Sequence, residues 1–250
     1  MHTEDTAIIN IGKNINICQI PGVNIQQLVC SHPTPSKLFA GQKKDRIIKS
    51  GHLRRTIDRY PATSLTKKFA LITQVHGNRC ALINYPKLLI QADACITQQP
   101  ELALSVYTAD CLPILISTKN GNTIAAIHAG WKGLFNNIIP NTIRSMRVKP
   151  DEMVVWIGPS ISQQHYEVSQ SFREQFISKH PQSKHYFDVI NHKVTFDCKG
   201  FAQSQLHTLN IHNINLSDIC TFATAQLPSY RRSKGKLTQR IWTHIWKVNK

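Results

Sequence analysis

The sequence is poor in acidic residues and contains no long apolar run. It has 14 Asp and Glu against 30 Lys and Arg, a formal net charge of +16 over 250 residues. No apolar segment approaches the roughly 18 residues that span a bilayer, and the first residues carry acid where a secretory leader carries base. The sequence therefore predicts a cytoplasmic protein with no membrane association.

The cysteine patterns of a disulfide framework and of a four-cysteine zinc knuckle are also missing. The seven cysteines are an odd number and include no CxxC pair. A free cysteine is by default a small buried hydrophobic residue, and reduced thiols fit a reducing compartment. Of the seven, only Cys111 occurs in a motif that indicates chemistry.

The positive charge is concentrated in two stretches. Residues 37–68 hold ten basic and two acidic residues, and residues 231–250 hold seven basic residues and no acid. The rest of the chain is close to neutral, which is not expected of a protein organised around a phosphate-tracking groove. The distribution favours a solvated basic surface over nucleic-acid binding, although an arginine from either stretch could bind the phosphate of a small substrate.

Short strands interleave with helices and hairpins, which indicates a mixed α/β fold in a single domain over residues 1–250. The Asn-Gly of KNGN (119–122) predicts a β-hairpin. Segment 31–64 is punctuated by Pro and Gly and gives no clear pattern. Strands are expected at 69–75, 81–83, 104–108, 113–117, 123–128, 154–157, 194–197, 219–222 and 241–246, and helices at 134–146, from about 166, and at 201–209.

Three residues at the ends of expected strands have side chains that suit a metal. His76 and Cys111 each follow a strand, and His128 precedes a glycine turn. Rigid scaffolds often present reactive side chains at such positions. Two imidazoles and a thiolate suit zinc, or copper, and three protein ligands leave a position open, as catalytic zinc sites do. Because these residues lie 35 and 17 positions apart, only the fold can bring them together.

The same residues support other interpretations. Cys111 could be a nucleophile with His128 as its base and Asp93 or Asp110 as the orienting carboxylate, as in cysteine hydrolases. In a metalloenzyme, either carboxylate could be a general acid or base, or could orient a ligand imidazole. Copper would suit a phenol oxidase, although a multicopper oxidase needs many more histidine ligands. A basic nucleic-acid-binding protein with a structural metal is the non-enzymatic alternative.

Several motifs occur in an order that resembles a bacterial family. They are TQVHG (73–77), AD (92–93), TADCLP (108–113), AIHAGWKG (126–133), IGP (157–159), CT (220–221) and SYRR (229–232). Over roughly residues 69–246 the series is similar to the polyphenol oxidase or laccase-domain family, now regarded as zinc-dependent purine nucleoside phosphorylases. Residues 1–68 diverge from the family pattern, because they lack its glycine-rich opening loop.

The resemblance implies that His76, Cys111 and His128 bind zinc. It also implies a three-layer fold in which a mixed β-sheet is flanked by helices. The implied reaction is cleavage by phosphate of a purine nucleoside such as adenosine, inosine, guanosine or methylthioadenosine, with adenosine deaminase activity beside it. The expected partners are the nucleoside and phosphate, in a monomer or a homodimer.

Phosphorolysis also requires residues that bind phosphate and the purine. Arg231 and Arg232 are the first candidates for phosphate, with Lys132 beside them, because guanidinium groups and helix N-termini suit anions. Trp131 could stack on the purine, although packing is the more common role of such an aromatic residue. Gln74 is a lesser candidate for contact with the substrate.

Overall fold

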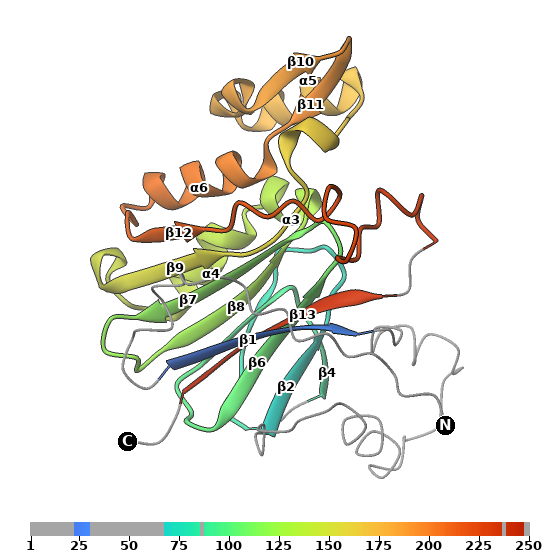
Figure 1. The fold of residues 1–250 in the computed structure, drawn as a ribbon. Helices are drawn as coiled ribbons and strands as arrows, with labels where there is room; N and C mark the ends of the chain where they lie inside the picture. Colours follow the sequence, from blue (N-terminus) through green and yellow to red (C-terminus); the bar gives the residue numbers. More distant parts are fainter. Residues whose placement is uncertain (1–22, 31–67, 86–87, 237–238, 248–250) are drawn as a thin grey trace, which may run out of the picture.

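The computed structural model describes residues 23–30, 68–85, 88–236 and 239–247. Their strands form a six-stranded sheet, a five-stranded sheet and a small two-stranded sheet. The two large sheets stack face to face, and helices cover the outer side of the six-stranded sheet (Figure 1). The segment 31–64, which gave no clear pattern, and nearly all of the basic stretch 37–68 lie outside the described residues.

The six-stranded sheet contains the predicted hairpin. Its order is β12 (Ile214–Leu216), β9 (Met153–Ile157), β7 (Leu112–Thr118), β8 (Ile124–Ala129), β5 (Ala94–Thr97) and β3 (Cys80–Leu82). Strands β7 and β8 pair antiparallel around a turn in which Gly121 has a φ of 71°. Every residue of β5, β7, β8 and β9 is buried, because both faces of this sheet are covered.

The five-stranded sheet has the order β1 (Val23–Cys30), β13 (Arg240–Lys247), β6 (Leu102–Thr108), β2 (Lys68–Thr73) and β4 (Leu88–Gln91). Strand β13 pairs antiparallel with β1 and with β6, whereas β2 is parallel to β6 and β4. Alternate residues of this sheet, such as Leu104 and Val106, pack against Leu115 and Trp156 of the six-stranded sheet. One part of the core therefore lies between the sheets.

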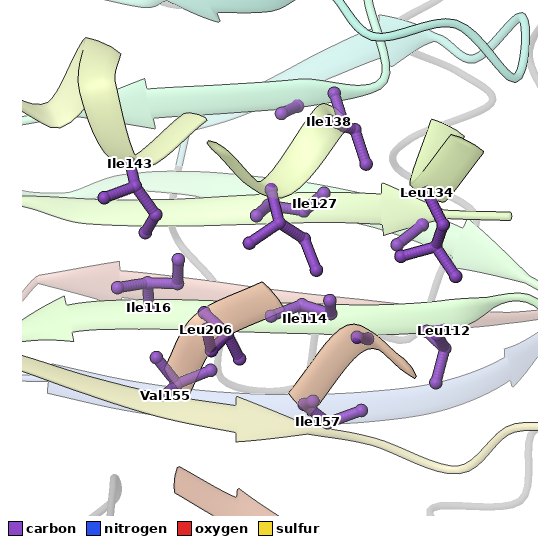
Figure 2. Packing of buried hydrophobic residues seen from close by; sticks show 14 of the residues in the cluster. Leu112, Ile114, Ile116, Ile127, Leu134, Ile138, Ile143, Val155, Ile157 and Leu206 are labelled. Atoms are coloured by element: carbon purple, nitrogen blue, oxygen red, sulfur yellow. The ribbon is translucent and has the colours of Figure 1, made fainter. Parts of the chain in front are cut away.

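The other part of the core lies under the helices. Helices α3 (Trp131–Phe135), α4 (Ile138–Met146) and α6 (Cys198–Thr208) cover the six-stranded sheet. Ile138 and Leu206 from the helices pack against Ile114 and Ile127 from the strands (Figure 2). Helix α5 (Gln170–Lys179) and the hairpin of β10 (Phe187–Ile190) and β11 (Lys193–Phe196) form a lobe at the top of Figure 1. None of the helices in the described ranges has both the length and the apolar character to cross a bilayer.

The mixed α/β class predicted from the sequence is confirmed. The resemblance implied a mixed sheet with helices on both faces. In the structure, helices cover one face of the six-stranded sheet and the five-stranded sheet covers the other. The expected helix at 134–146 is divided at Asn137, whose φ is 64°. The expected strand at 219–222 is wrong: this segment makes a single bridge, and its Thr221 side chain bonds to Asp110 instead.

Candidate metal and substrate site

The three predicted metal ligands come together where the two large sheets meet. His76 follows β2, Cys111 immediately precedes β7, and His128 lies in β8, the partner of β7. Their ligand atoms all lie within 4.8 Å of one another. The distance from Cys111 Sγ to His76 Nε2 is 4.0 Å, and the two imidazole centroids are 4.7 Å apart. Within the described part of the chain, this is the one group of three or more such side chains that could hold a metal.

Asp93 hydrogen-bonds to two of the three residues, His76 and His128. Its carboxylate accepts hydrogen bonds from His128 Nδ1 at 2.8 Å, from the His76 backbone N–H at 2.9 Å and from the Gly77 N–H at 2.7 Å. The bond to Nδ1 leaves Nε2 of His128 available as a ligand. The side chain is fully buried and borders neither of the hollows described below, so its position suits an orienting carboxylate better than a general acid or base.

Two backbone features allow the side chains of His76, Cys111 and His128 to approach one another. His76 has a φ of 60°, an unfavourable conformation for a residue with a Cβ, and Asp93 holds the turn through the hydrogen bonds to its N–H groups. At Gly130 an added Cβ would lie 3.0 Å from Cys111 Sγ and 3.1 Å from His76 Cδ2. A larger residue at this position would therefore displace two ligands.

The ligands also shift one another's protonation. Burial raises the pKa of the Cys111 thiol, but the charge and hydrogen bonds of His128 and His76 outweigh burial and bring the pKa to about 6. Burial lowers the pKa of His128, but Cys111 and Asp93 raise it to about 9. The thiolate is the form of cysteine that binds metals and that attacks as a nucleophile, so this environment suits Cys111 to either role.

Two adjoining hollows open beside the ligands. The first, of about 240 Å³, is bordered by Asp110, Ile161, Tyr166, Cys198 and Arg231. The second, of about 450 Å³, is bordered by Gln74, Tyr107, Thr108, Lys132 and Arg240. Both reach His76, Ala109, Cys111, Trp131 and Tyr230. Together they offer the concave space that a small substrate needs next to the ligands.

Trp131, Lys132 and Gln74 all border these hollows. Trp131 is 37% exposed and packs edge-on against Phe172, with ring centroids 5.1 Å apart. Lys132 Nζ lies 5.5 Å from the centroid of the Trp131 ring. The amide group of Gln74 exchanges two hydrogen bonds with the backbone of Tyr107, at 2.8 and 2.9 Å. Gln74 therefore ties β2 to β6, and its amide is already committed to this contact.

The two predicted arginines have different environments. Arg231 borders the first hollow, donates to the Glu167 carbonyl at 2.8 Å and lies over the Tyr166 ring at 5.1 Å. Arg232 borders neither hollow. Its guanidinium donates to five backbone carbonyls of the preceding loop, those of Thr221, Phe222, Thr224, Ala225 and Leu227. The structure thus brings Arg231 but not Arg232 to the candidate site.

Asp110 connects the Cys111 turn to the loop that carries Arg231. Its Oδ1 accepts a hydrogen bond from Thr221 Oγ1 at 2.6 Å, and its Oδ2 accepts one from the Arg231 N–H at 2.7 Å. Its φ of 87° is a conformation that side chains rarely adopt, so tertiary contacts must hold it. Both oxygens are engaged, which favours a positioning role over proton transfer.

Replacement of Asp110 by alanine is therefore expected to lower the free energy of unfolding of the metal-free protein by about 2 to 4 kcal/mol, because two donors lose an anionic acceptor. Urea unfolding measures this loss, with Asp151→Ala, an exposed carboxylate, as the control. Unchanged stability together with the loss of one limb of the pH–rate profile would identify Asp110 as a general acid or base instead.

Other residues at the hollows were not predicted from the sequence. Tyr166 and Cys198 border the first, and Tyr107, Thr108 and Arg240 border the second. Tyr230 is part of the SYRR motif, which was the one signal for it. Arg240 lies in the basic stretch 231–250, which could supply a phosphate-binding arginine, but nothing local singles it out or indicates that pairing of β13 with β6 brings it to the site.

A mixed α/β fold with a two-histidine, one-cysteine group beside a hollow defines a candidate metalloenzyme. The chain belongs to the family described as multi-copper polyphenol oxidoreductase laccase, whose model matches residues 44–248. The resemblance identified from the motifs is thus confirmed. Within the described residues a single three-ligand group is found, where multicopper chemistry requires several metal sites.

Related proteins are named as phosphorylases. The purine nucleoside phosphorylase of Haemophilus influenzae is 33% identical over 192 residues, which cover 72% of this chain and 79% of the relative. The purine nucleoside phosphorylase YfiH of Escherichia coli is 31% identical, over 73% of this chain and 77% of the relative. The crystal structure of a Neisseria meningitidis protein, 25% identical, superposes with a TM-score of 0.69 and covers 90% of this chain and 95% of its own.

Proposed function

We propose that this protein is a zinc-dependent purine nucleoside phosphorylase. The observation that carries the proposal is the group of His76, Cys111 and His128 beside the two hollows. The names of the relatives support the reaction class. Adenosine, inosine, guanosine and methylthioadenosine are the proposed substrates, and deamination of adenosine is a proposed second activity.

The donor set fits zinc. Two imidazole nitrogens and a thiolate are ligands that zinc prefers, and three protein ligands leave a position for a substrate or for water. The Asp93–His128 hydrogen bond adds the second-sphere contact typical of such sites. When bound, zinc would act as a Lewis acid and would activate water near neutral pH, which suits the deamination.

The chain's own residues bind and orient the two substrates. In phosphorolysis an oxygen of hydrogen phosphate forms a bond to C1′ of the ribose as the bond from C1′ to the purine nitrogen breaks. The bonding electrons go to the purine, and the proton lost by hydrogen phosphate balances the one that the purine gains. Trp131, Tyr166 and Tyr230 offer aromatic faces to the purine, and the nearby cations suit phosphate. Holding both reactants in line lowers the barrier.

A second candidate function is a cysteine hydrolase. Asp93, His128 and Cys111 lie in the order orienting carboxylate, base and nucleophile, and the low pKa of Cys111 would favour attack by the thiolate. The third ligand, His76, has no role in such a triad. For that reason the metal-dependent reaction is the stronger proposal.

The test is phosphate-dependent release of base from the four nucleosides by purified full-length protein, together with its metal content. We expect about one zinc per chain, and release that requires phosphate, stops when a chelator removes the metal and returns when zinc is restored. Hydrolysis that survives metal removal and is stopped by a thiol reagent would favour the cysteine hydrolase.

A further inference from the structure

The second hollow has the charge of an anion site. Lys132 of α3 and Arg240 of β13 both border it, and none of the described residues around it is Asp or Glu. Arg240 is only partly exposed, and its Nη1 donates to the Gln239 carbonyl at 2.7 Å, whereas Lys132 is exposed. A partly desolvated guanidinium beside an ammonium group favours a compact dianion such as phosphate, because charge-assisted hydrogen bonds strengthen away from bulk water.

The two arginines predicted from the sequence do not border the second hollow. Arg232 donates to five backbone carbonyls and reaches neither hollow. Arg231 borders only the first hollow, where it donates to the Glu167 carbonyl and lies over Tyr166. Among the described residues, Lys132 and Arg240 are the lysine and the arginine that border the second hollow.

A buried hydroxyl group beside the second hollow also indicates an anion site. Thr108 borders this hollow, is 2% exposed, and its Oγ1 makes no hydrogen bond among the described residues. Thr108 pairs with Ile241 in the sheet, and Arg240 immediately precedes Ile241 on β13. A buried hydroxyl without a partner costs free energy, and an anion in the adjoining space would offer it an acceptor.

The first hollow has a different chemistry. Ile161 and Tyr166 give it an apolar and an aromatic wall that the second hollow lacks, as a purine requires, and it shares Cys111, Trp131 and Tyr230 with the second. We propose that phosphate binds in the second hollow through Lys132, Arg240 and Thr108, and that the nucleoside occupies the first. The two substrates then meet beside the metal ligands. The inference rests on the proposed phosphorylase function for its substrates, but the anion site can be tested separately.

The experiment titrates inorganic phosphate into the full-length, zinc-loaded protein by calorimetry and measures the KM of phosphate and of the nucleoside. Lys132→Met and Arg240→Met are each expected to weaken phosphate binding roughly tenfold to a hundredfold and to raise the phosphate KM in parallel, because a hydrogen bond to a charged group is lost. Arg144→Met, an exposed cation on α4, is the control and should change neither value. Arg231→Met should raise the nucleoside KM and leave phosphate binding intact.

Unchanged phosphate binding in Lys132→Met and Arg240→Met, or its loss only in Arg231→Met, would overturn the assignment whether or not the protein turns over nucleosides. Failure of the wild type to bind phosphate would also overturn it. Phosphate binding that depends on both cations without any base release would retain the anion site and reject the phosphorylase function. If Arg240→Met unfolds, Arg240→Lys retains the charge but loses the guanidinium fork, and should weaken binding by a smaller factor.

Discussion

Cys111→Ala is expected to remove the metal and the activity together. The substitution deletes the thiolate among three proposed ligands whose atoms lie within 4.8 Å of one another, and two imidazoles alone hold zinc poorly. Bound zinc should fall from about one per chain to near zero. Turnover should fall by more than about a hundredfold, because even changes to residues that merely orient ligands cost about 10- to 100-fold in such sites.

The matched control is Cys80→Ala. Cys80 is also a partly buried free thiol, but it lies in β3, borders neither hollow, and burial raises its pKa to about 11. This variant should keep its zinc and its turnover. Alkylation by iodoacetamide gives a second measurement, since a thiolate bound to zinc is protected and one with a pKa of about 6 is not. Retention of full zinc by Cys111→Ala would remove this residue from the ligand set.

Asp93→Ala is expected to lower both metal affinity and stability. The carboxylate is fully buried and accepts from the N–H groups of His76 and Gly77 and from His128 Nδ1. Its removal leaves buried donors unpaired and releases the strained turn at His76. The free energy of unfolding should fall by about 3 to 5 kcal/mol, the usual cost of removing one partner of a buried charged pair.

Asp93→Asn separates the two effects. The amide retains one oxygen in nearly the same shape, so most of the stability should remain. The neutral amide oxygen is a weaker hydrogen-bond acceptor for His128 Nδ1 than a carboxylate. Zinc affinity should therefore fall about 10- to 100-fold. Chemical unfolding of the metal-free protein and competition with a zinc chelator measure the two quantities. If both variants bind zinc like the wild type, Asp93 does not orient His128.

The sequence predicted which residues cluster as possible metal ligands better than it predicted which polar side chains border the hollows, for a physical reason. His76, Cys111 and His128 lie at strand ends within recognisable motifs, and strands that pair side by side bring such ends together. The partners of Gln74 and Arg232 are backbone carbonyl and amide groups, which carry no sequence signal. Only the folded chain could show that these two polar side chains are already engaged.

Arg240 and the second sheet illustrate the same limit at longer range. Pairing of β13 with β6 joins segments more than one hundred positions apart, and no local pattern specifies that register. The expected strand at 219–222 failed for a related reason. Its residues have strand-like composition, but Thr221 bonds to Asp110 and the backbone pairs only at Cys220.

The position of β13 between β1 and β6 has a consequence for folding during synthesis on the ribosome. Of the strands in the described ranges, β1 is made first and pairs with β13 alone, from Val23 opposite Lys247 to Cys30 opposite Arg240. Among the described strands, β1 therefore has no partner until residues 240–247 have left the exit tunnel. Such distant pairing is slow and leaves a strand edge exposed to aggregation. A nascent chain stalled before β13 should hold a largely formed hairpin of β7 and β8 next to an open sheet, which makes it a natural client for chaperones.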